Sequence, residues 1–462
     1  MSVSSRLQGM QPTDIGVPGP SSLDMARAFR SVRADPLTFL GQVSEEYGDL
    51  VSFPVPGPPA LLLNDPADVR HVLQTSARSW GKQTVQYAAL GRVTGPGLLA
   101  SSEPSWIEHR RLAAPAFHHE RLDAVGDQVR AAADAAITGR LGVGAAGGEL
   151  VDVAALTHRI GLDAVGRALF SADLSGHAQR LLDATADAAD IVVRLGRSIL
   201  PTATWAPTRT NLRLRSTRRR LDTISADLIA QRRRRGRASA DGSSGDDLLG
   251  LLLDSGLSDA EVRDELVTMV IAGHETVAAA LAWTLMLLAE DQPAQERVRA
   301  ELASHPGPVA LLGHRETLPW TRAVVDEALR LFPPAWVVSR RAQRDDVVGG
   351  HAVPVGTLVI VSPWLVHRRS DAWPDPLAFR PERFLGASGT PAAYLPFGQG
   401  PRLCIGREFA LGEMVVVLSR LLTAYRLDVP PRWTRPVAQA QVAVHPRGGM
   451  PLVVTPLERT PG

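Results

Sequence analysis

The sequence predicts a mainly α-helical protein with a minor β-sheet. Helical periodicity dominates the middle of the chain, in Ala-rich segments at about 119–141, 152–170, 176–198 and 208–236. Short apolar runs bounded by Pro and Gly indicate strands at about 50–63 and 335–362 and in the region beyond residue 425. No repeat or low-complexity linker divides the 462 residues. We therefore expect a single domain at 21–462, after an extended leader at 1–20.

Composition excludes several classes of protein. Hydrophobic residues make up 45% of the chain and charged residues 21%, and a single cysteine rules out a disulfide framework. The net charge of +2 gives no indication of nucleic-acid binding, and the Arg-rich stretch at 213–237 lacks the aromatic residues that stack on bases. The N-terminus has no apolar signal segment, and the apolar runs look too short or too interrupted to span a bilayer. These features predict a cytoplasmic protein with no membrane anchor, and we expect it to be a monomer.

The N-terminal part of the chain predicts a mixture of elements. Helical patterns at about 22–31 and 36–47 precede a hairpin formed by 50–55 and 60–63, and a further helix starts at Asp65. Residues 79–104 contain several glycines and little periodicity, which predicts a long loop. In the helix expected at 104–118, Trp106 and Arg110 are four residues apart and share a face. Alone, this pair indicates only a partly buried Trp beside a surface Arg.

The longest helical pattern runs from Ser258 to Glu290. Ser258 and Glu261 form a capping box, and 33 residues at 1.5 Å each would span about 50 Å. Its middle reads Ala-Gly-His-Glu-Thr, at 272–276. Gly weakens a helix, and a Thr hydroxyl can bond to the carbonyl four residues earlier. Alone, these residues indicate a packing notch in a helix that crosses the molecule.

A shorter helix at 320–332 carries an acid–base pair, Glu327 and Arg330. Such pairs are usually surface ion pairs of little value. The next segment, 335–340, reads as a strand, whose alternation places Arg340 and Arg341 on opposite faces. His367, before a Pro-rich meander, reads as a structural residue.

The single cysteine stands where a loop meets a helix. Gly398, Gly400 and Pro401 impose an irregular backbone before Cys404, and a helical pattern follows it. The unpaired N–H groups of a helix N-terminus lower the pKa of a nearby thiol, which favours a nucleophile or a metal ligand. The alternative is a buried small hydrophobe.

The surrounding residues decide between these interpretations. The pattern F-x-x-G-x-R-x-C-x-G resembles the haem-binding loop of the cytochromes P-450, and its five fixed positions are filled by Phe397, Gly400, Arg402, Cys404 and Gly406. The resemblance implies a haem-thiolate fold, with the long helix crossing haem b and Cys404 as the axial ligand of its iron. It also implies contacts to the cofactor from Phe397, Gly398, Arg402 and Gly406.

The other motifs occur in the family's order over about 106–412, and their spelling resembles soluble bacterial members. By resemblance, haem propionates are bound by Trp106, Arg110 and Arg340. Ala272 and Gly273 lie over the haem at a widened turn, where Glu275 and Thr276 deliver protons to O2. Glu327 and Arg330 are expected to lock onto Arg383 as a structural brace. The substrate pocket is expected to include Ala272, Ala335, Trp336 and Val337, under a lid that includes Leu200 and Trp205.

The implied activity is monooxygenation of a hydrophobic small molecule, such as a terpenoid, fatty acid or polyketide of secondary metabolism. No flavin or ferredoxin module fits in the remaining residues, so electrons would pass from NAD(P)H through a reductase and a separate ferredoxin or flavodoxin. Candidates for docking that partner are Arg111, Arg121 and Arg407.

Three alternatives stay open. The enzyme could catalyse desaturation, epoxidation or oxidative coupling in place of hydroxylation. A haem-binding sensor or carrier would keep Cys404 but would not need Glu275 and Thr276. A cysteine hydrolase would use Cys404 with a histidine, and it would leave the other motifs unexplained.

Overall fold

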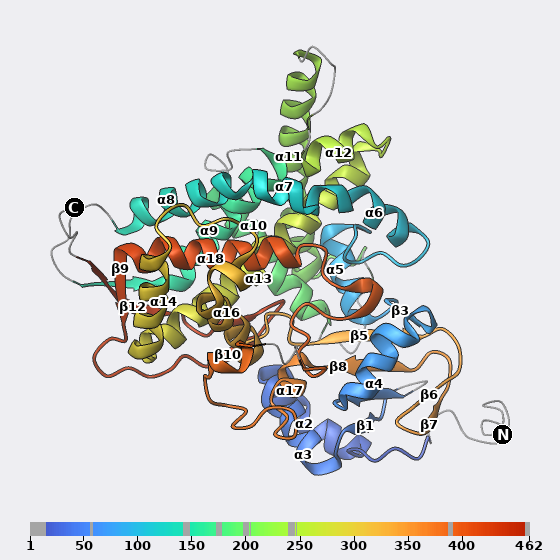
Figure 1. The fold of residues 1–462 in the computed structure, drawn as a ribbon. Coiled ribbons are helices and arrows are strands. Elements are labelled where there is room, and N and C mark those ends of the chain that lie inside the picture. Colours follow the sequence, from blue (N-terminus) through green and yellow to red (C-terminus); the bar gives the residue numbers. More distant parts are fainter. Residues whose placement is uncertain are drawn as a thin grey trace.

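Helices form most of the molecule, and a five-stranded sheet lies at one end of them (Figure 1). The computed structural model describes residues 15–457 except 56–58, 142–147, 172–177, 197–202, 204, 239–244, 246 and 387–390. Most of the predicted leader, and Leu200 of the predicted lid, lie outside the described residues. The predicted fold class is confirmed: the chain is mainly α-helical with a minor β-component.

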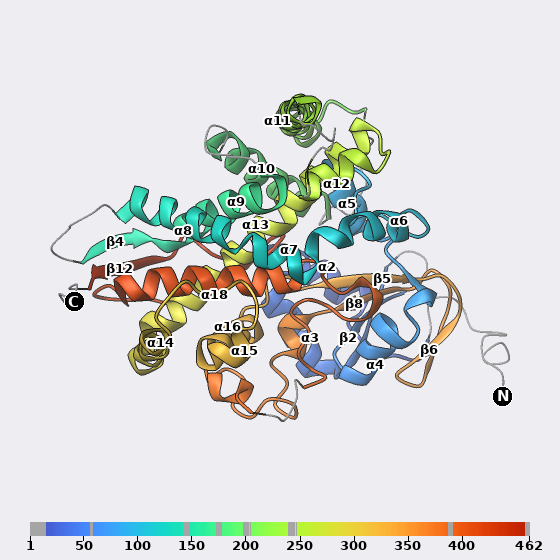
Figure 2. The ribbon, with the colours of Figure 1, turned by 45° about the horizontal axis from the view of Figure 1, so that its top comes forward.

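Helix α13 (Asp259–Glu290) runs through the middle of the helical region (Figures 1 and 2). Its N-terminus has the predicted capping box, in which Ser258 Oγ accepts from the Glu261 N–H (3.3 Å) and Glu261 accepts from the Ser258 N–H (2.8 Å). Its 32 residues span about 48 Å. Residues 277–289 are all buried, so the second half of α13 is core on every face.

The composition of α13 corrects one expectation. Within the described part of the chain, it is the one helix long and apolar enough to cross a membrane, with a mean hydropathy of 1.5 in its best window. The sequence had predicted no apolar run long enough to span a bilayer. However, 83% of that window is buried inside the protein, which is the environment of a core helix.

The helices around α13 build the core in layers (Figure 2). Helix α9 (Val153–Phe170) packs along α13, α8 (Gly126–Leu141) covers α9, and α18 (Arg407–Ala424) contacts both α8 and α13. Helices α14 (Gln292–Ser304) and α16 (Pro319–Leu331) pack beside α18. The Trp283 and Phe332 rings stack at 4.1 Å between centroids where α13 meets the end of α16.

The remaining helices surround this core. They are α2 (Ser22–Ala34), α3 (Pro36–Tyr47), α4 (Pro66–Arg70), α5 (Val85–Thr94), α6 (Ser105–Ala113), α7 (His119–Ala124), α10 (Ala178–Gly196), α11 (Arg209–Ala238), α12 (Leu248–Asp254), α15 (His314–Thr317) and α17 (Pro363–Val366). The described residues also form one π-helical turn, η1 (His71–Thr75), and four 3-10 turns: η2 (Ala77–Ser79), η3 (Ala114–Phe117), η4 (Pro381–Phe384) and η5 (Gly400–Arg402).

The main sheet has the strand order β1-β2-β8-β5-β3. Its strands are β1 (Leu50–Phe53), β2 (Ala60–Leu63), β3 (Trp80–Gly81), β5 (Val338–Ala342) and β8 (Leu358–Val361). β1 and β2 form the predicted hairpin pair, with Leu50 opposite Leu63, and β2 runs parallel to β8. In β5, Arg340 is buried and Arg341 is not, as the alternation predicted.

Smaller sheets close the fold. β12 (Pro451–Pro456) pairs with both β4 (Glu149–Asp152) and β9 (Tyr425–Asp428), so the C-terminal strand joins two distant parts of the chain. Two further pairs are β6 (Asp346–Val348) with β7 (His351–Val353), and β10 (Ala438–Ala440) with β11 (Val444–Pro446).

The predicted loop at 79–104 is wrong in part, because it contains β3 and α5. α5 begins after Thr84, which is extended, and it ends at Gly95, whose φ is +80°. It buries Ala89, Leu90 and Val93, a helical spacing that the glycines on either side obscured in the sequence. The helix packs against α10.

Candidate functional site

The loop before α18 holds Cys404 in a fixed backbone. Gly398 and Gly400 have φ of +74° and +70°, the left-handed region that glycine tolerates. The Cys404 N–H donates to the Phe397 carbonyl (3.0 Å), and this bond closes the loop. A Cβ on Gly400 would lie 2.1 Å from the Leu73 carbonyl oxygen, so the loop rests directly on η1.

The pKa of the Cys404 thiol differs from the value expected from the helix N-terminus alone. The residue has solvent-accessible surface, yet the protein atoms around it desolvate the sulfur. This burial raises the pKa of the thiol above its ordinary value, although the Gly406 N–H and the Arg110 guanidinium lower it. The expected net lowering is therefore wrong, because desolvation outweighs the helix terminus. A thiol that binds a metal ion loses its proton regardless.

Four cationic side chains from separate segments form a cluster: Arg110, Arg340 and Arg402 act electrostatically on Lys82. Of these, Lys82 and Arg110 also act on the Cys404 sulfur. Burial lowers the pKa of Lys82 well below its usual value, and the three guanidinium groups lower it further. None of the four forms an ion pair with a carboxylate in the part of the chain that the structure describes. Buried positive charges need an anionic partner. This donor set fits the two propionates of a haem whose iron binds Cys404.

The predicted Trp106 and Arg110 both contact the cysteine loop. Arg110 Nη1 donates to the Leu403 carbonyl (2.7 Å). The Arg402 guanidinium carbon lies 3.7 Å from the centroid of the Trp106 ring. Both contacts join α6 to the residues directly before Cys404, so α6 and the loop can hold one ligand between them.

Lys82 is the residue of this cluster that the sequence analysis missed. Its Nζ donates to the Leu99 carbonyl (3.0 Å) and lies 4.5 Å from the centroid of the Tyr87 ring. A cavity of about 540 Å³ beside it is lined by residues of α5 and the segment that follows. The signal in the sequence was that Lys82 is the chain's single lysine among many arginines.

On α13, the Ala272–Thr276 turn carries an acid and an alcohol. Thr276 Oγ1 donates to the Ala272 carbonyl (2.8 Å), as expected. Glu275 is buried, and its Oε2 has no hydrogen-bond partner in the described part of the chain. Burial raises the pKa of this carboxyl to about 8. A Cβ on Gly273 would lie 2.9 Å from a Val165 methyl, so Gly273 lets α9 approach closely. The predicted widened turn is not seen, because α13 is a continuous α-helix through these residues.

A group of histidines behind this turn was not predicted. His158 of α9 lies 5.8 Å from His274 and 5.3 Å from His445 of β11, between ring centroids. Burial lowers the pKa of His274 to about 4 and that of His445 to about 3, so both rings are neutral at neutral pH. Their positions are far apart in the sequence, and no motif connects them.

The acid–base pair of α16 is fully buried. Arg330 donates to Glu327 from Nε (2.7 Å) and Nη2 (2.8 Å), and Arg383 Nε donates to the same carboxylate (3.3 Å). His367 Nδ1 lies 3.0 Å from the Arg330 carbonyl, and its Nε2 accepts from the Leu395 N–H (2.9 Å). These bonds tie α16 to the start of the cysteine loop.

The predicted pocket residues Ala335, Trp336 and Val337 are all partly buried and precede β5. Trp336 packs against two core clusters, and its Nε1 donates to the Gln441 carbonyl (2.9 Å). None of the three lines either of the two cavities described here. Their assignment to a substrate pocket stays a prediction.

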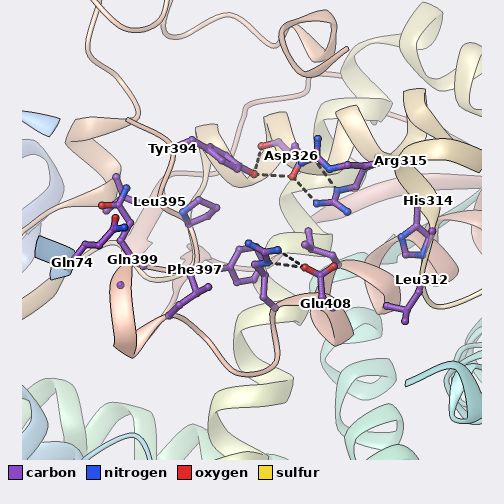
Figure 3. A pocket seen from close by; sticks show the side chains of 18 of the residues that line it. Gln74, Leu312, His314, Arg315, Asp326, Tyr394, Leu395, Phe397, Gln399 and Glu408 are labelled. Carbon is purple, nitrogen blue, oxygen red and sulfur yellow. Dashed lines mark hydrogen bonds and ion pairs between the residues drawn. The ribbon is translucent and has the colours of Figure 1, made fainter. Parts of the chain in front are cut away.

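A groove of about 1150 Å³ lies behind the cysteine loop (Figure 3). Its charged side chains pair with one another: Asp326 accepts from Arg322 and Tyr394, and Arg407 pairs with Glu408. Of the arginines suggested for partner docking, Arg407 lines this groove, whereas Arg111 and Arg121 do not.

Comparison with known proteins agrees with this site. The family model described as Cytochrome P450 matches residues 20–453. Pentalenene oxygenase of Streptomyces avermitilis is 31% identical and covers 98% of this chain and 99% of its own. Cyclooctat-9-en-7-ol 5-monooxygenase of Streptomyces melanosporofaciens is 31% identical, with 90% of each chain covered. The crystal structure of CYP175A1 from Thermus thermophillus superposes with a TM-score of 0.77 at 31% identity, over 95% of this chain and 100% of the other.

Proposed function

Because the chain belongs to the cytochrome P450 family, it is a haem-dependent monooxygenase, and we propose that it oxygenates a hydrophobic terpenoid. The observation that carries the chemistry is the position of Cys404 beside a cluster of four cations that form no ion pair with a carboxylate among the described residues. The substrate class is supported by relatives named as oxygenases of pentalenene and cyclooctat-9-en-7-ol, which are terpenoids. A fatty acid or a polyketide would be the alternative substrate.

When bound, haem b would supply the activation of O2 and its insertion into the substrate. The chain's own residues would hold the cofactor and supply protons. Lys82, Arg110, Arg340 and Arg402 would bind the propionates, and Cys404 would ligate the iron. Glu275, neutral below about pH 8, would donate protons, and the Thr276 oxygen would accept a hydrogen bond from the water that carries them.

Electrons would come from NAD(P)H through a reductase and a ferredoxin or flavodoxin. The groove behind the cysteine loop supports this proposal, because its lining residues include Phe397 and Leu403 close to the sulfur. Arg407 and Arg315 lie on this face and would contact an acidic partner. We also propose that the protein acts as a cytoplasmic, single-domain monomer that binds no nucleic acid.

The test begins with the absorption spectrum of the dithionite-reduced protein under carbon monoxide. We expect the strongly red-shifted Soret band of a thiolate-ligated haem, and its loss in Cys404→Ser. Titration with sesquiterpenes and diterpenes should then displace water and shift the ferric haem toward high spin. A spin shift given only by fatty acids or polyketides would overturn the terpenoid assignment.

Product analysis separates the remaining alternatives. Turnover with a ferredoxin, its reductase and NADPH should give an alcohol that carries one oxygen atom from labelled O2. An unlabelled alkene or coupled product would instead identify desaturation or oxidative coupling. A non-catalytic haem sensor would give the spectrum without any product.

A further inference from the structure

A buried carboxylate joins three elements beside the cation cluster. Glu265 lies in α13, about two turns before Ala272, and is 1% exposed. Its Oε1 accepts hydrogen bonds from Nδ1 of His109 in α6 (2.6 Å) and from the Leu98 N–H in the turn after α5 (2.8 Å). Its Oε2 is buried and has no hydrogen-bond partner among the described residues. One oxygen atom of α13 therefore binds both α6 and this turn through hydrogen bonds.

The turn after α5 lies directly against α13. A Cβ on Gly97 would be 2.4 Å from Thr268 Oγ1 and 2.9 Å from the Asp264 carbonyl oxygen. The turn is thus packed on α13 at Gly97 and hydrogen-bonded to it at the next residue, Leu98. We therefore expect the turn and α13 to move together.

Both fastened segments hold members of the cation cluster. His109 directly precedes Arg110 on α6. In the turn, the carbonyl of Leu99 accepts from Lys82 (3.0 Å) and the carbonyl of Ser101 accepts from Arg402 (3.0 Å). Three of the four cations are thus positioned by backbone that Glu265 holds.

We propose that Glu265 and His109 form a positioning pair that holds the cation cluster in place for the haem propionates, so that the charge on His109 controls how tightly haem is retained. Neither residue contacts the reacting atoms, and both act through Lys82, Arg110 and Arg402. The inference depends on haem binding but not on the identity of the substrate.

The charges around His109 determine whether haem retention rises or falls with pH. The hydrogen bond to Glu265 raises the pKa of His109, burial opposes this, and Glu108 and Glu261 raise the pKa further. Other charged groups on the elements packed against it include Arg110 and Arg111 on α6, Arg263 and Asp264 on α13 and Asp254 at the end of α12. Glu103 stands just before α6, and η3 has no charged residue. Since the pKa is raised, the ion pair is complete at low pH and is lost as pH rises through that pKa. Haem should then dissociate faster.

The test measures haem transfer from the purified ferric holoprotein to excess apomyoglobin, between about pH 6 and pH 9. His109→Asn keeps an N–H donor near the position of Nδ1 but does not titrate. His109→Leu removes the donor, and Glu265→Gln removes the charge. Asp264→Asn is the matched control, because it neutralises the adjacent carboxylate, which pairs with Arg263 and contacts neither His109 nor Leu98.

In the wild type and in Asp264→Asn, we expect haem loss to accelerate as pH rises. His109→Asn should lose haem at the wild type's high-pH rate throughout, with no step. His109→Leu and Glu265→Gln should lose haem on the order of tenfold faster at every pH. A pH step that persists in His109→Asn, or wild-type haem retention in His109→Leu, would overturn the proposal. If His109→Leu fails to fold, the pH profile of His109→Asn decides alone.

Discussion

Glu275 and Thr276 are neighbours on one turn, but their surroundings suit them to different parts of a proton transfer. Glu275 is desolvated, and its raised pKa of about 8 keeps the carboxyl protonated at neutral pH. Thr276 already donates its hydroxyl proton to the Ala272 carbonyl, so its oxygen is available as an acceptor. One side chain can therefore give a proton, and the other can hold the water that carries it.

Removing the Thr276 hydroxyl should uncouple the enzyme. In Thr276→Ala we expect product formation to fall by about 10²-fold or more, while NADPH oxidation continues and hydrogen peroxide accumulates. Thr276→Ser, which keeps the hydroxyl, is the control and should retain most of the coupling. Measuring product and peroxide per NADPH checks this, and unchanged coupling in Thr276→Ala would exclude the proton-delivery role.

The raised pKa of Glu275 predicts a pH profile for turnover. The carboxyl donates only while protonated, so product formation should decline as pH rises through about 8. In Glu275→Gln the rate should be low and this limb absent. Rates measured with saturating redox partner across the range provide the test, and an alkaline limb that is the same in both proteins would assign it to another group.

Lys82 offers a direct chemical probe of the cofactor site, because it is the chain's single lysine. Burial and three guanidinium groups lower the pKa of its amine, which favours the nucleophilic neutral form. We expect an amine-selective reagent to modify Lys82 in the haem-free protein and to spare it in the holoprotein. Mass spectrometry of the modified peptide measures both, and equal labelling would show that haem does not cover Lys82.

At the scale of elements, the histidine group links three pieces of secondary structure. His158, His274 and His445 come from α9, α13 and β11, and their rings lie within 6 Å of a neighbour in the group. No carboxylate bonds to the three rings in the part of the chain that the structure describes, although Asp152 acts on His158 from a distance. The contact is stable only while the rings are neutral, because protonation would place like charges together in a desolvated region.

This arrangement predicts a stability loss in acid. The folded pKa values of about 4 and 3 lie below the unfolded value of about 6.5. The stability is therefore fully present above about pH 6.5 and declines as pH falls toward about 3. Urea unfolding at several pH values measures the decline. His445→Gln should flatten the curve over this range, and a slope identical to that of the wild type would contradict the assignment.

At the scale of the whole molecule, the cysteine loop is supported by segments from many parts of the chain. α6 reaches it through Arg110 and Trp106, His367 bonds to Leu395, and η1 supports Gly400. The η1 contact leaves no room for a Cβ at Gly400, and it joins residues more than 300 positions apart. The loop geometry is thus a property of the assembled fold.

Gly400→Ala tests that support. The new methyl would meet the Leu73 carbonyl at 2.1 Å, and φ of +70° would strain any other residue. We expect a loss of about 1–3 kcal/mol in unfolding free energy and a weaker ferrous–CO spectrum of the thiolate form. Gly398→Ala is the control, because it has a similar φ of +74° but no atom within 4 Å, so it should show the strain without the clash. Equal effects in the two variants would show that the η1 contact does not support the loop.

The sequence by itself determined the family, the fold class, the long central helix and the short motifs around Cys404, Glu275, Thr276 and Glu327. Each of these depends on residues within a few positions of one another, where spacing decides which side chains share a turn or a face. The helix α5 was missed for a related reason: glycines beside a short helix resemble a loop until the packing partner α10 is known.

Only the tertiary structure decided which distant residues meet and how strongly they are desolvated. Lys82 joins Arg340, Glu265 joins His109, and three histidines form one group, although no local pattern connects them. The pKa of Cys404 is the clearest case. Its local sequence favours a lowered value, but burial by the surrounding protein raises it, because desolvation depends on every atom around the sulfur and not on its neighbours in the chain.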